Sequence, residues 1–251
     1  MKGAIVLKSS TLSIKETASK LDWKFSEGCE YLNFFNGPTG NLSRNLIIGK
    51  DDVDVIGTPV ANGHSVTFNH QQNFLQTKIK HTDRMTILAV GKAPDPAEES
   101  FMVSNYGGII PGTTSTTTGQ SLMFRAGTNC YHILTTRNKS TGATGLVQTA
   151  ATQTLGKPQC LVARFGGVNS LNGTNLFNMT NGTNNANGIN PDVVEMVLGA
   201  DLRIGSGYSL AAGKPAEIYA IAIWSRVLGT AEIQAVYADI KSRMGEDGVP
   251  I

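Results

Sequence analysis

Residues Ala216 to Met244, AEIYAIAIWSRVLGTAEIQAVYADIKSRM, decide how the rest of the chain is interpreted. The first part, Glu217 to Trp224, is short and rich in Ile, Tyr and Trp, so it favours a strand over a helix. Its apolar side chains fall on both faces, which is typical of a strand that is covered on both sides. The pattern therefore predicts one long buried strand close to the C-terminus.

A helix is expected directly after this strand. Thr230 is suited to cap its first turn, because a hydroxyl can accept a hydrogen bond from an unpaired backbone N–H. Glu232 lies in that turn, where negative charge stabilises the helix dipole, and Gly245 is placed to end the helix in a left-handed conformation. The predicted buried face, at helical spacing, consists of Ile233, Val236, Tyr237, Ile240 and Met244.

The turn between strand and helix carries a recognisable pattern. Its residues and those of the helix that fit the pattern are Arg226, Val227, Leu228, Glu232, Ile233 and Tyr237, and the run Leu202 to Gly205 fits the strand before them. Together they resemble the end of a laminin-G-like, concanavalin A-like jelly roll, over roughly residues 45 to 244. The resemblance implies an all-β fold, an antiparallel jelly-roll β-sandwich (concanavalin A-like) with one short C-terminal helix.

The order of turn signals agrees with a sandwich. Clusters of Gly, Pro, Asn and Asp separate short apolar runs throughout the chain, as in antiparallel sheets and unlike βαβ units. The expected strands include Leu46–Ile48, Arg84–Gly91, Cys160–Phe165 and a short one at Leu146–Gln148. We divide the chain into an N-terminal arm or docking segment, residues 1–44, and a laminin-G-like sandwich, residues 45–251.

The N-terminal arm is unusually aromatic. Aromatic residues make up only 7% of the chain, yet several gather between residues 23 and 35. Two interpretations stay open: the arm folds back and packs on the sandwich, or it docks another subunit, since aromatic residues are enriched at the centre of interfaces. On the second interpretation the protein is a homo-oligomer, and the interface candidates are Trp23, Phe25, Tyr31, Phe34 and Phe35.

Two loops contain residue types that bind sugars. Tyr106–Gln120 is rich in Gly and Thr, and Val168–Asn190 is rich in Asn and Gly. Amides and hydroxyls suit sugar hydroxyls, and an aromatic ring packs against the apolar face of a sugar. Alternatively, the Asn-rich stretch forms a strand pair with wide loops, or both loops only contact neighbouring subunits. The glycan-binding candidates are Tyr106, Asn172, Asn175, Asn178 and Tyr208.

Composition limits the range of functions. The 251 residues carry a formal net charge of +2 and only 16% charged residues, so charge indicates neither a nucleic acid nor an anionic membrane as partner. Apolar runs are shorter than the ~20 residues that cross a bilayer. The N-terminus lacks the apolar core of a signal peptide, so we expect synthesis in a cytoplasm. Cys29, Cys130 and Cys160 lack the spacing of a disulfide or zinc framework, and we expect buried thiols and no cofactor.

Known catalytic patterns are missing from the sequence. Glycosidases that share this jelly roll use paired carboxylates of the type Glu-x-Asp-x-Glu on one strand, and no such run occurs. The acidic cluster Asp51, Asp52 and Asp54 lacks the glycine and the downstream glutamate of a strong calcium loop, so it is interpreted as a solvated turn. The histidines show no metal-ligand spacing. We therefore expect a protein that is not an enzyme and binds no metal.

A jelly roll with few charges, loops rich in Asn, Gly and Thr, and no export signal resembles the virion proteins of phages and prophages. The resemblance implies a non-catalytic structural protein of a tail fibre, tail tip or head decoration, made in the host cytoplasm and assembled into the virion. Its expected partners are other virion proteins, further copies of itself and a host surface glycan. Two alternatives stay open: a polysaccharide-degrading enzyme of the same fold and a bacterial adhesion module.

Overall fold

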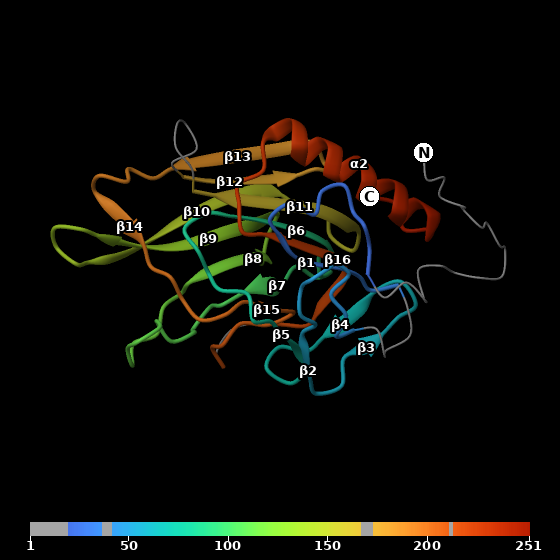
Figure 1. Cartoon of the computed structure of the whole chain (residues 1–251), viewed down its shortest axis with the longest axis horizontal. Helices are drawn as coiled ribbons and strands as arrows, with labels where there is room; N and C mark the ends of the chain where they lie inside the picture. Colours follow the sequence, from blue (N-terminus) through green and yellow to red (C-terminus); the bar gives the residue numbers. More distant parts are fainter. Residues whose placement is uncertain (1–19, 37–41, 167–172, 211–212) are drawn as a thin grey trace.

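The computed structural model describes residues 20–36, 42–166, 173–210 and 213–251, and in these ranges two antiparallel sheets pack face to face (Figure 1). The first sheet has the order β13 (Thr183–Gly188), β12 (Gly173–Asn178), β11 (Pro158–Phe165), β6 (Met85–Lys92), β16 (Ala216–Trp224), β4 (Val66–Phe68) and β3 (Val60–Ala61), with β1 (Cys29–Phe34) also paired to β16. The second has the order β10 (Thr144–Thr152), β9 (Asn129–Asn138), β8 (Gln120–Phe124), β7 (Ser100–Ser104), β15 (Arg203–Ile204), β5 (Phe74–Gln76) and β2 (Asp54–Ile56), with β14 (Val194–Met196) paired to β9.

The predicted C-terminal strand is β16, and it lies near the centre of the first sheet between β6 on one side and β1 and β4 on the other. Ile221 and Ile223 face the second sheet and belong to the core between the sheets. Ala222 and Trp224 point the opposite way, into a second apolar cluster. The strand is therefore covered on both faces, as its sequence predicted.

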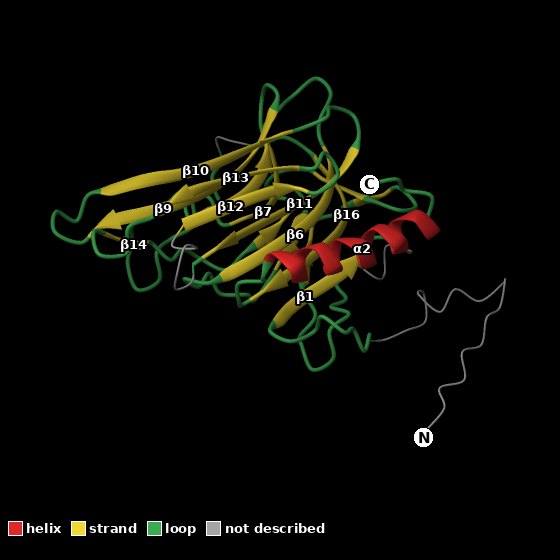
Figure 2. Cartoon of the chain, turned by 90° about the horizontal axis from the view of Figure 1, so that it is seen from above, coloured by secondary structure: helices red, strands yellow, loops and turns green. Residues whose placement is uncertain are grey.

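The helix α2 (Thr230–Glu246) covers the outer face of the first sheet (Figure 2). Its buried residues are Ile233, Val236, Ile240 and Met244, which confirms the predicted face, while Tyr237 is half-buried. Trp224 is fully buried beneath this face. Together with the two sheets, the helix confirms an all-β sandwich that ends in one helix.

The ends of α2 differ from their predicted form. Gly229, in an extended conformation, is the N-cap, and no side chain caps the first turn. The Thr230 hydroxyl instead accepts a hydrogen bond from Arg164 at 3.3 Å. At the other end the helix continues past Gly245, and Gly248, with φ of 75°, takes the left-handed conformation. The prediction that the Thr230 hydroxyl caps the helix and that Gly245 ends it in a left-handed conformation was therefore wrong.

Strand β1 lies on the N-terminal side of the boundary that the sequence placed at residue 44, yet it is a strand of the first sheet. It pairs antiparallel with the C-terminal half of β16, where Leu32 lies opposite Ala222. Residues 20–36 therefore fold back onto the sandwich, which is the first of the two interpretations of the arm.

Most of the aromatic residues in this segment pack against the rest of the chain. Trp23, Tyr31 and Phe35 are buried within the chain, whereas Phe25 and Phe34 are half-buried. The Trp23 ring lies 5.7 Å from that of Trp224, and its indole N–H donates to a carboxylate oxygen of Asp239 on α2 at 2.9 Å. The three buried rings thus contribute to the core of this chain rather than to a free surface.

Other differences concern single strands. Leu46–Ile48 forms no strand, and Ile47 makes one isolated bridge to Leu21. The expected short strand at Leu146–Gln148 is part of the much longer β10. The described part of the Asn-rich stretch forms the β12–β13 hairpin, which is the strand pair that its sequence left open. Within the described ranges, none of the helical structure is long and apolar enough to span a membrane.

Candidate functional site

A groove of about 420 Å³ lies on the second sheet, between the loop 106–120 and the β9–β10 hairpin. Its lining residues, among those that the structure describes, are all uncharged. Hydroxyl groups come from Thr116, Thr117, Thr118, Thr135, Thr144 and Ser209, and apolar surface comes from Tyr106, Ile110, Leu146 and Val197. We call this the threonine groove.

The floor of the threonine groove follows from strand alternation. On β9, His132 and Leu134 belong to the interior, so the next side chain, that of Thr135, points outward. The Thr135 hydroxyl is hydrogen-bonded to the hydroxyl of Thr118, which ties the loop to the sheet. Leu146 lies directly opposite Thr135 on β10 and is 51% exposed, so it forms an apolar wall.

Tyr106 supplies the aromatic wall. Its ring stacks on Phe101 with centroids 5.6 Å apart and is half-buried. Its carbonyl oxygen accepts the backbone N–H groups of Tyr208 at 2.5 Å and Ser209 at 3.1 Å. Among the described residues no partner is found for its hydroxyl group, which is therefore free to bond a ligand.

The loop that carries Tyr106 is held by its own backbone. Gly107 donates to the carbonyl of Thr117 at 2.8 Å, and Thr117 donates back to Gly108 at 2.9 Å. Further along, Ile110 donates to Ser115 at 2.9 Å. These bonds make the loop a hairpin-like element, so the groove has a defined wall without a bound ligand.

Asn105 anchors the base of this loop. Its side chain is fully buried, the amide oxygen accepts the N–H of Gln120 at 2.6 Å, and the amide nitrogen donates to the carbonyl of Ala200 at 2.7 Å. Gly119 is required beside it: its φ is 54°, and a Cβ atom there would lie 2.0 Å from the Asn105 amide oxygen. Sequence reasoning missed Asn105, because Ala200 and His81, two partners of its side chain, are distant in the sequence.

The glycan-binding candidates are split between the two sheets. Tyr208 lies against Tyr106, but its ring is covered by the Arg203 guanidinium at 3.5 Å and its hydroxyl donates to the backbone carbonyl of Asp201 at 2.9 Å. It therefore supports the groove and does not line it.

The asparagine candidates lie elsewhere. Asn175 and Asn178 belong to β12 of the first sheet. Asn178 is fully buried and donates to Thr152 and Gln159, both at 2.8 Å, while Asn175 accepts a hydrogen bond from Arg164 at 3.1 Å. The structure does not bring these two residues to Tyr106, and Asn172 lies outside the described residues.

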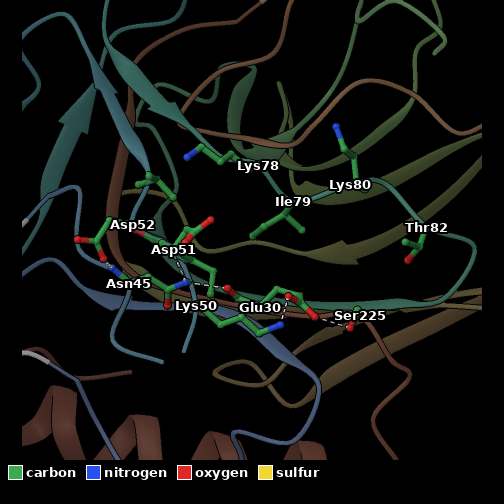
Figure 3. Close-up of a pocket in the computed structure, with 12 residues that line it drawn as sticks. Glu30, Asn45, Lys50, Asp51, Asp52, Lys78, Ile79, Lys80, Thr82 and Ser225 are labelled. Carbon is green, nitrogen blue, oxygen red and sulfur yellow. Dashed lines mark hydrogen bonds and ion pairs between the residues drawn. The ribbon is translucent and has the colours of Figure 1, made fainter. Parts of the chain in front are cut away.

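A second hollow, of about 310 Å³, is lined by charged residues (Figure 3). At its lower edge Lys50 donates to Glu30 at 2.5 Å, and Ser225 donates to the other oxygen of the same carboxylate at 2.7 Å. Lys78 and Lys80 extend from the opposite edge, and Lys80 pairs with Asp201 at 2.8 Å. We call this the charged hollow.

Two carboxylates of the charged hollow, those of Glu30 and Asp52, are held ionised. Burial opposes charge on Glu30, but hydrogen bonds from Lys50 and Ser225 and the charge of Lys50 outweigh it, so its pKa is lowered. The Asn45 backbone N–H, with Lys20, lowers the pKa of Asp52. Neither group is suited to donate a proton near neutral pH, as a glycosidase acid must. In the described ranges no group of three or more metal-ligating side chains is found.

Comparison with known proteins shows the fold. No family model matches the sequence, and no curated protein matches it. Among solved structures, the binding domain of botulinum neurotoxin serotype D aligns with a TM-score of 0.55 and 14% identity, covering 85% of this chain and 52% of that one. The binding domain of Paraclostridial Mosquitocidal Protein 1 aligns with a TM-score of 0.54 and 12% identity, covering 86% and 53%.

A sialidase from Trypanosoma rangeli, solved in complex with sialic acid, aligns with a TM-score of 0.53 and 11% identity, covering 83% of this chain and 32% of the sialidase. The chain thus spans about half the length of the two binding domains and about a third of the sialidase. These similarities establish a jelly-roll-like β-sandwich. At this level of identity they establish the fold alone, and the laminin-G-like assignment stays a prediction.

Proposed function

We propose that the protein is a non-catalytic carbohydrate-binding protein and that it binds a neutral glycan in the threonine groove. The observation that carries this proposal is the composition of the groove, where the described lining residues supply several hydroxyl groups and one aromatic ring and no charged side chain. The similarity in fold to binding domains and to a sialidase supports the same class of function.

The chemistry of the groove suits neutral sugars. Hydroxyl groups both donate and accept hydrogen bonds, so Thr116 and Thr144 at the exposed rim can pair with sugar hydroxyls in either direction. Tyr106 offers part of an aromatic ring and a hydroxyl group, and Leu146 offers apolar contact. An acidic sugar such as sialic acid would find no cation among the lining residues, so acidic glycans are expected to bind less well.

A glycan array of neutral and acidic oligosaccharides tests this proposal. We expect a signal from neutral glycans that is lost in Tyr106→Ala and weakened in Thr144→Val. Tyr237→Ala is the matched control, because it removes a half-buried tyrosine from α2 on the opposite side of the sandwich. Equal loss in the control variant, or a signal from acidic glycans alone, would contradict the proposal.

The proposal of a non-catalytic protein rests on the same lining. Glycoside hydrolysis commonly uses two carboxyl groups on either side of the bond that is cleaved, and the described lining of the threonine groove presents none. Incubating the protein with the polysaccharide that it binds should therefore release no new reducing ends. Release of reducing ends that disappears in Glu30→Gln or Asp52→Asn would favour the hydrolase and place its site in the charged hollow.

We further propose that the protein is a phage virion structural protein that acts in several copies, bound to other virion proteins and to a host surface glycan. The sparse charge and the Asn-, Gly- and Thr-rich loops support this proposal, and a weak single sugar site would gain strongly from repetition. Light scattering should detect an oligomer, and the protein should co-purify with phage particles. A monomer found only on bacterial surfaces would favour an adhesion module.

A further inference from the structure

Two buried histidines lie in the interior beside the threonine groove, and neither takes part in the proposed binding. His81 is 4% exposed, and its ring packs edge-on against Phe165 with centroids 5.9 Å apart. Its Nδ1 atom faces two donors, the backbone N–H of Gly199 at 3.1 Å and the side-chain amide of Asn105 at 3.2 Å. These donors belong to the two segments that form the base of the groove, 105–120 and 197–200.

The proton on His81 is placed by its neighbours. The Asn105 amide cannot be turned over, because its oxygen would then face the carbonyl of Ala200 and its nitrogen the N–H of Gln120. The amide nitrogen must therefore point at His81, together with the N–H of Gly199. Nδ1 of His81 has to be the unprotonated acceptor, and the ring has to be neutral with its proton on Nε2.

We propose that His81 is a pH-sensitive latch, whose neutral ring holds the loop 105–120 against residues 199 and 200 and whose protonation releases that loop. A proton on Nδ1 would face two N–H donors, so both hydrogen bonds would be lost together. Tyr106 follows Asn105 directly, so release would displace the aromatic wall of the groove. The effect on glycan binding rests on the proposed function, whereas the latch itself does not.

The surroundings of His81 do not favour a protonated, positively charged ring. From β9 it faces His132, another buried ring, whose Nδ1 is hydrogen-bonded to the Thr174 hydroxyl. In its own segment Lys80 pairs with Asp201 from the neighbouring segment, so that carboxylate is already neutralised. In the described part of the chain no hydrogen-bond partner is found for Nε2 of His81. A protonated ring would therefore stay buried without a counter-charge, which favours opening.

The size of the effect follows from linkage. Burial lowers the pKa of His81 from 6.5 to about 4 in the closed structure, and a released, solvated ring returns to the ordinary value. Because the open form then binds the proton more tightly, the ratio of open to closed loop rises by about 20-fold between neutral pH and pH ~5. The closed loop is favoured above pH ~6.5 and is progressively released as the pH falls toward about 4.

Amide hydrogen exchange tests the latch without any ligand. At about pH 5, corrected for the intrinsic pH dependence of exchange, peptides from 105–120 and 197–202 should lose protection relative to about pH 7.5, while β6 and β16 keep theirs. In His81→Gln the loss should disappear, because a glutamine oxygen can accept both hydrogen bonds and does not titrate. His64→Gln is the control, since His64 is exposed, and should behave like the wild type.

Two results would overturn the latch: unchanged protection of 105–120 at both pH values, or the same acid-induced loss in His81→Gln. If His81→Gln fails to fold, an NMR titration of the wild-type His81 ring decides. A pKa well below 6.5 with loop release in the same pH range supports the latch, and titration near 6.5 with a protected loop contradicts it. Exchange needs no glycan, so failure of the latch and failure of glycan binding are separately visible.

Discussion

The outer faces of the two sheets differ in what covers them. On the first, α2 closes over a large apolar cluster that includes Trp224, Ile233 and Met244. On the second, the described residues form a small cluster of Phe101, Met123 and Ile133 outside the core between the sheets. The helix leaves the first face closed, whereas the second keeps the threonine groove open beside its small apolar cluster.

The difference separates stability from binding. A face covered by a helix contributes buried apolar area and little that a ligand can reach. A face that keeps hydroxyl groups and a tyrosine accessible contributes less to stability and more to recognition. The account therefore expects substitutions on the helix side to change the free energy of unfolding, and those in the groove to change binding.

The largest expected effect is on the helix side. Ile233→Ala removes a side chain that is 1% exposed and should lower the free energy of unfolding by about 2–5 kcal/mol through lost contacts and a cavity. Gln234→Ala, at the exposed neighbouring position, should change it by less than ~0.5 kcal/mol. Chemical denaturation measures both. Equal small effects would mean that α2 contributes little to the fold and would remove the contrast between the faces.

Low pH should reduce the free energy of unfolding through two buried histidines beside the groove. Burial, and for His132 also the nearby His81, lowers the pKa values of His81 to about 4 and of His132 to about 3, from 6.5 in the unfolded chain. These are bases with lowered folded pKa values, so their stabilisation is present above pH ~6.5 and is lost as the pH falls below it. At pH ~5 the loss should be about 4 kcal/mol for the pair. Denaturation curves at several pH values measure it, and a flat profile between pH ~7 and ~5 would contradict the burial of neutral rings.

The smallest expected change in stability concerns the base of the groove. Asn105→Ala leaves the N–H of Gln120 and the carbonyl of Ala200 without their partner and should cost about 1–3 kcal/mol. Unlike Ile233→Ala, it should also weaken neutral-glycan binding, because it frees the loop that carries Tyr106. Binding should be compared in the two variants under conditions where both are fully folded, so that a difference reports on the groove and not on stability. Unchanged binding in Asn105→Ala would mean that the position of the loop 105–120 does not matter for glycan binding.

The helix side was predictable because its signals are local. The strand β16 and the buried face of α2 follow from apolar spacing within one continuous stretch, and the structure confirms Trp224 and Ile233 in their predicted burial. The capping of α2 was not predictable, since the Thr230 hydroxyl accepts a hydrogen bond from Arg164, a residue 66 positions away in the sequence. Strand β1 was missed because its pairing with β16 depends on tertiary contacts.

The groove side was only partly predictable. Tyr106 was identified because sugar binding needs an aromatic ring beside amides and hydroxyls, and the loop 106–120 offers both. Asn178 was also selected, although it is buried, because an amide that binds Gln159 inside the chain looks the same in sequence as one that faces a ligand. Asn105 and His81 were missed since their partners lie far along the chain: Ala200 is 95 positions from Asn105, and Gly199 is 118 from His81.

The central claim is that the threonine groove is the binding face, and backbone NMR tests it most directly. Isotope-labelled protein would be titrated with the neutral trisaccharides chitotriose and maltotriose. The account predicts that at least one of them shifts amide signals of residues 106–118, 134–136 and 144–146, and that Tyr106→Ala abolishes these shifts. Shifts confined to residues 45–53 and 78–82 around the charged hollow, or the same groove shifts in Tyr106→Ala, would contradict it.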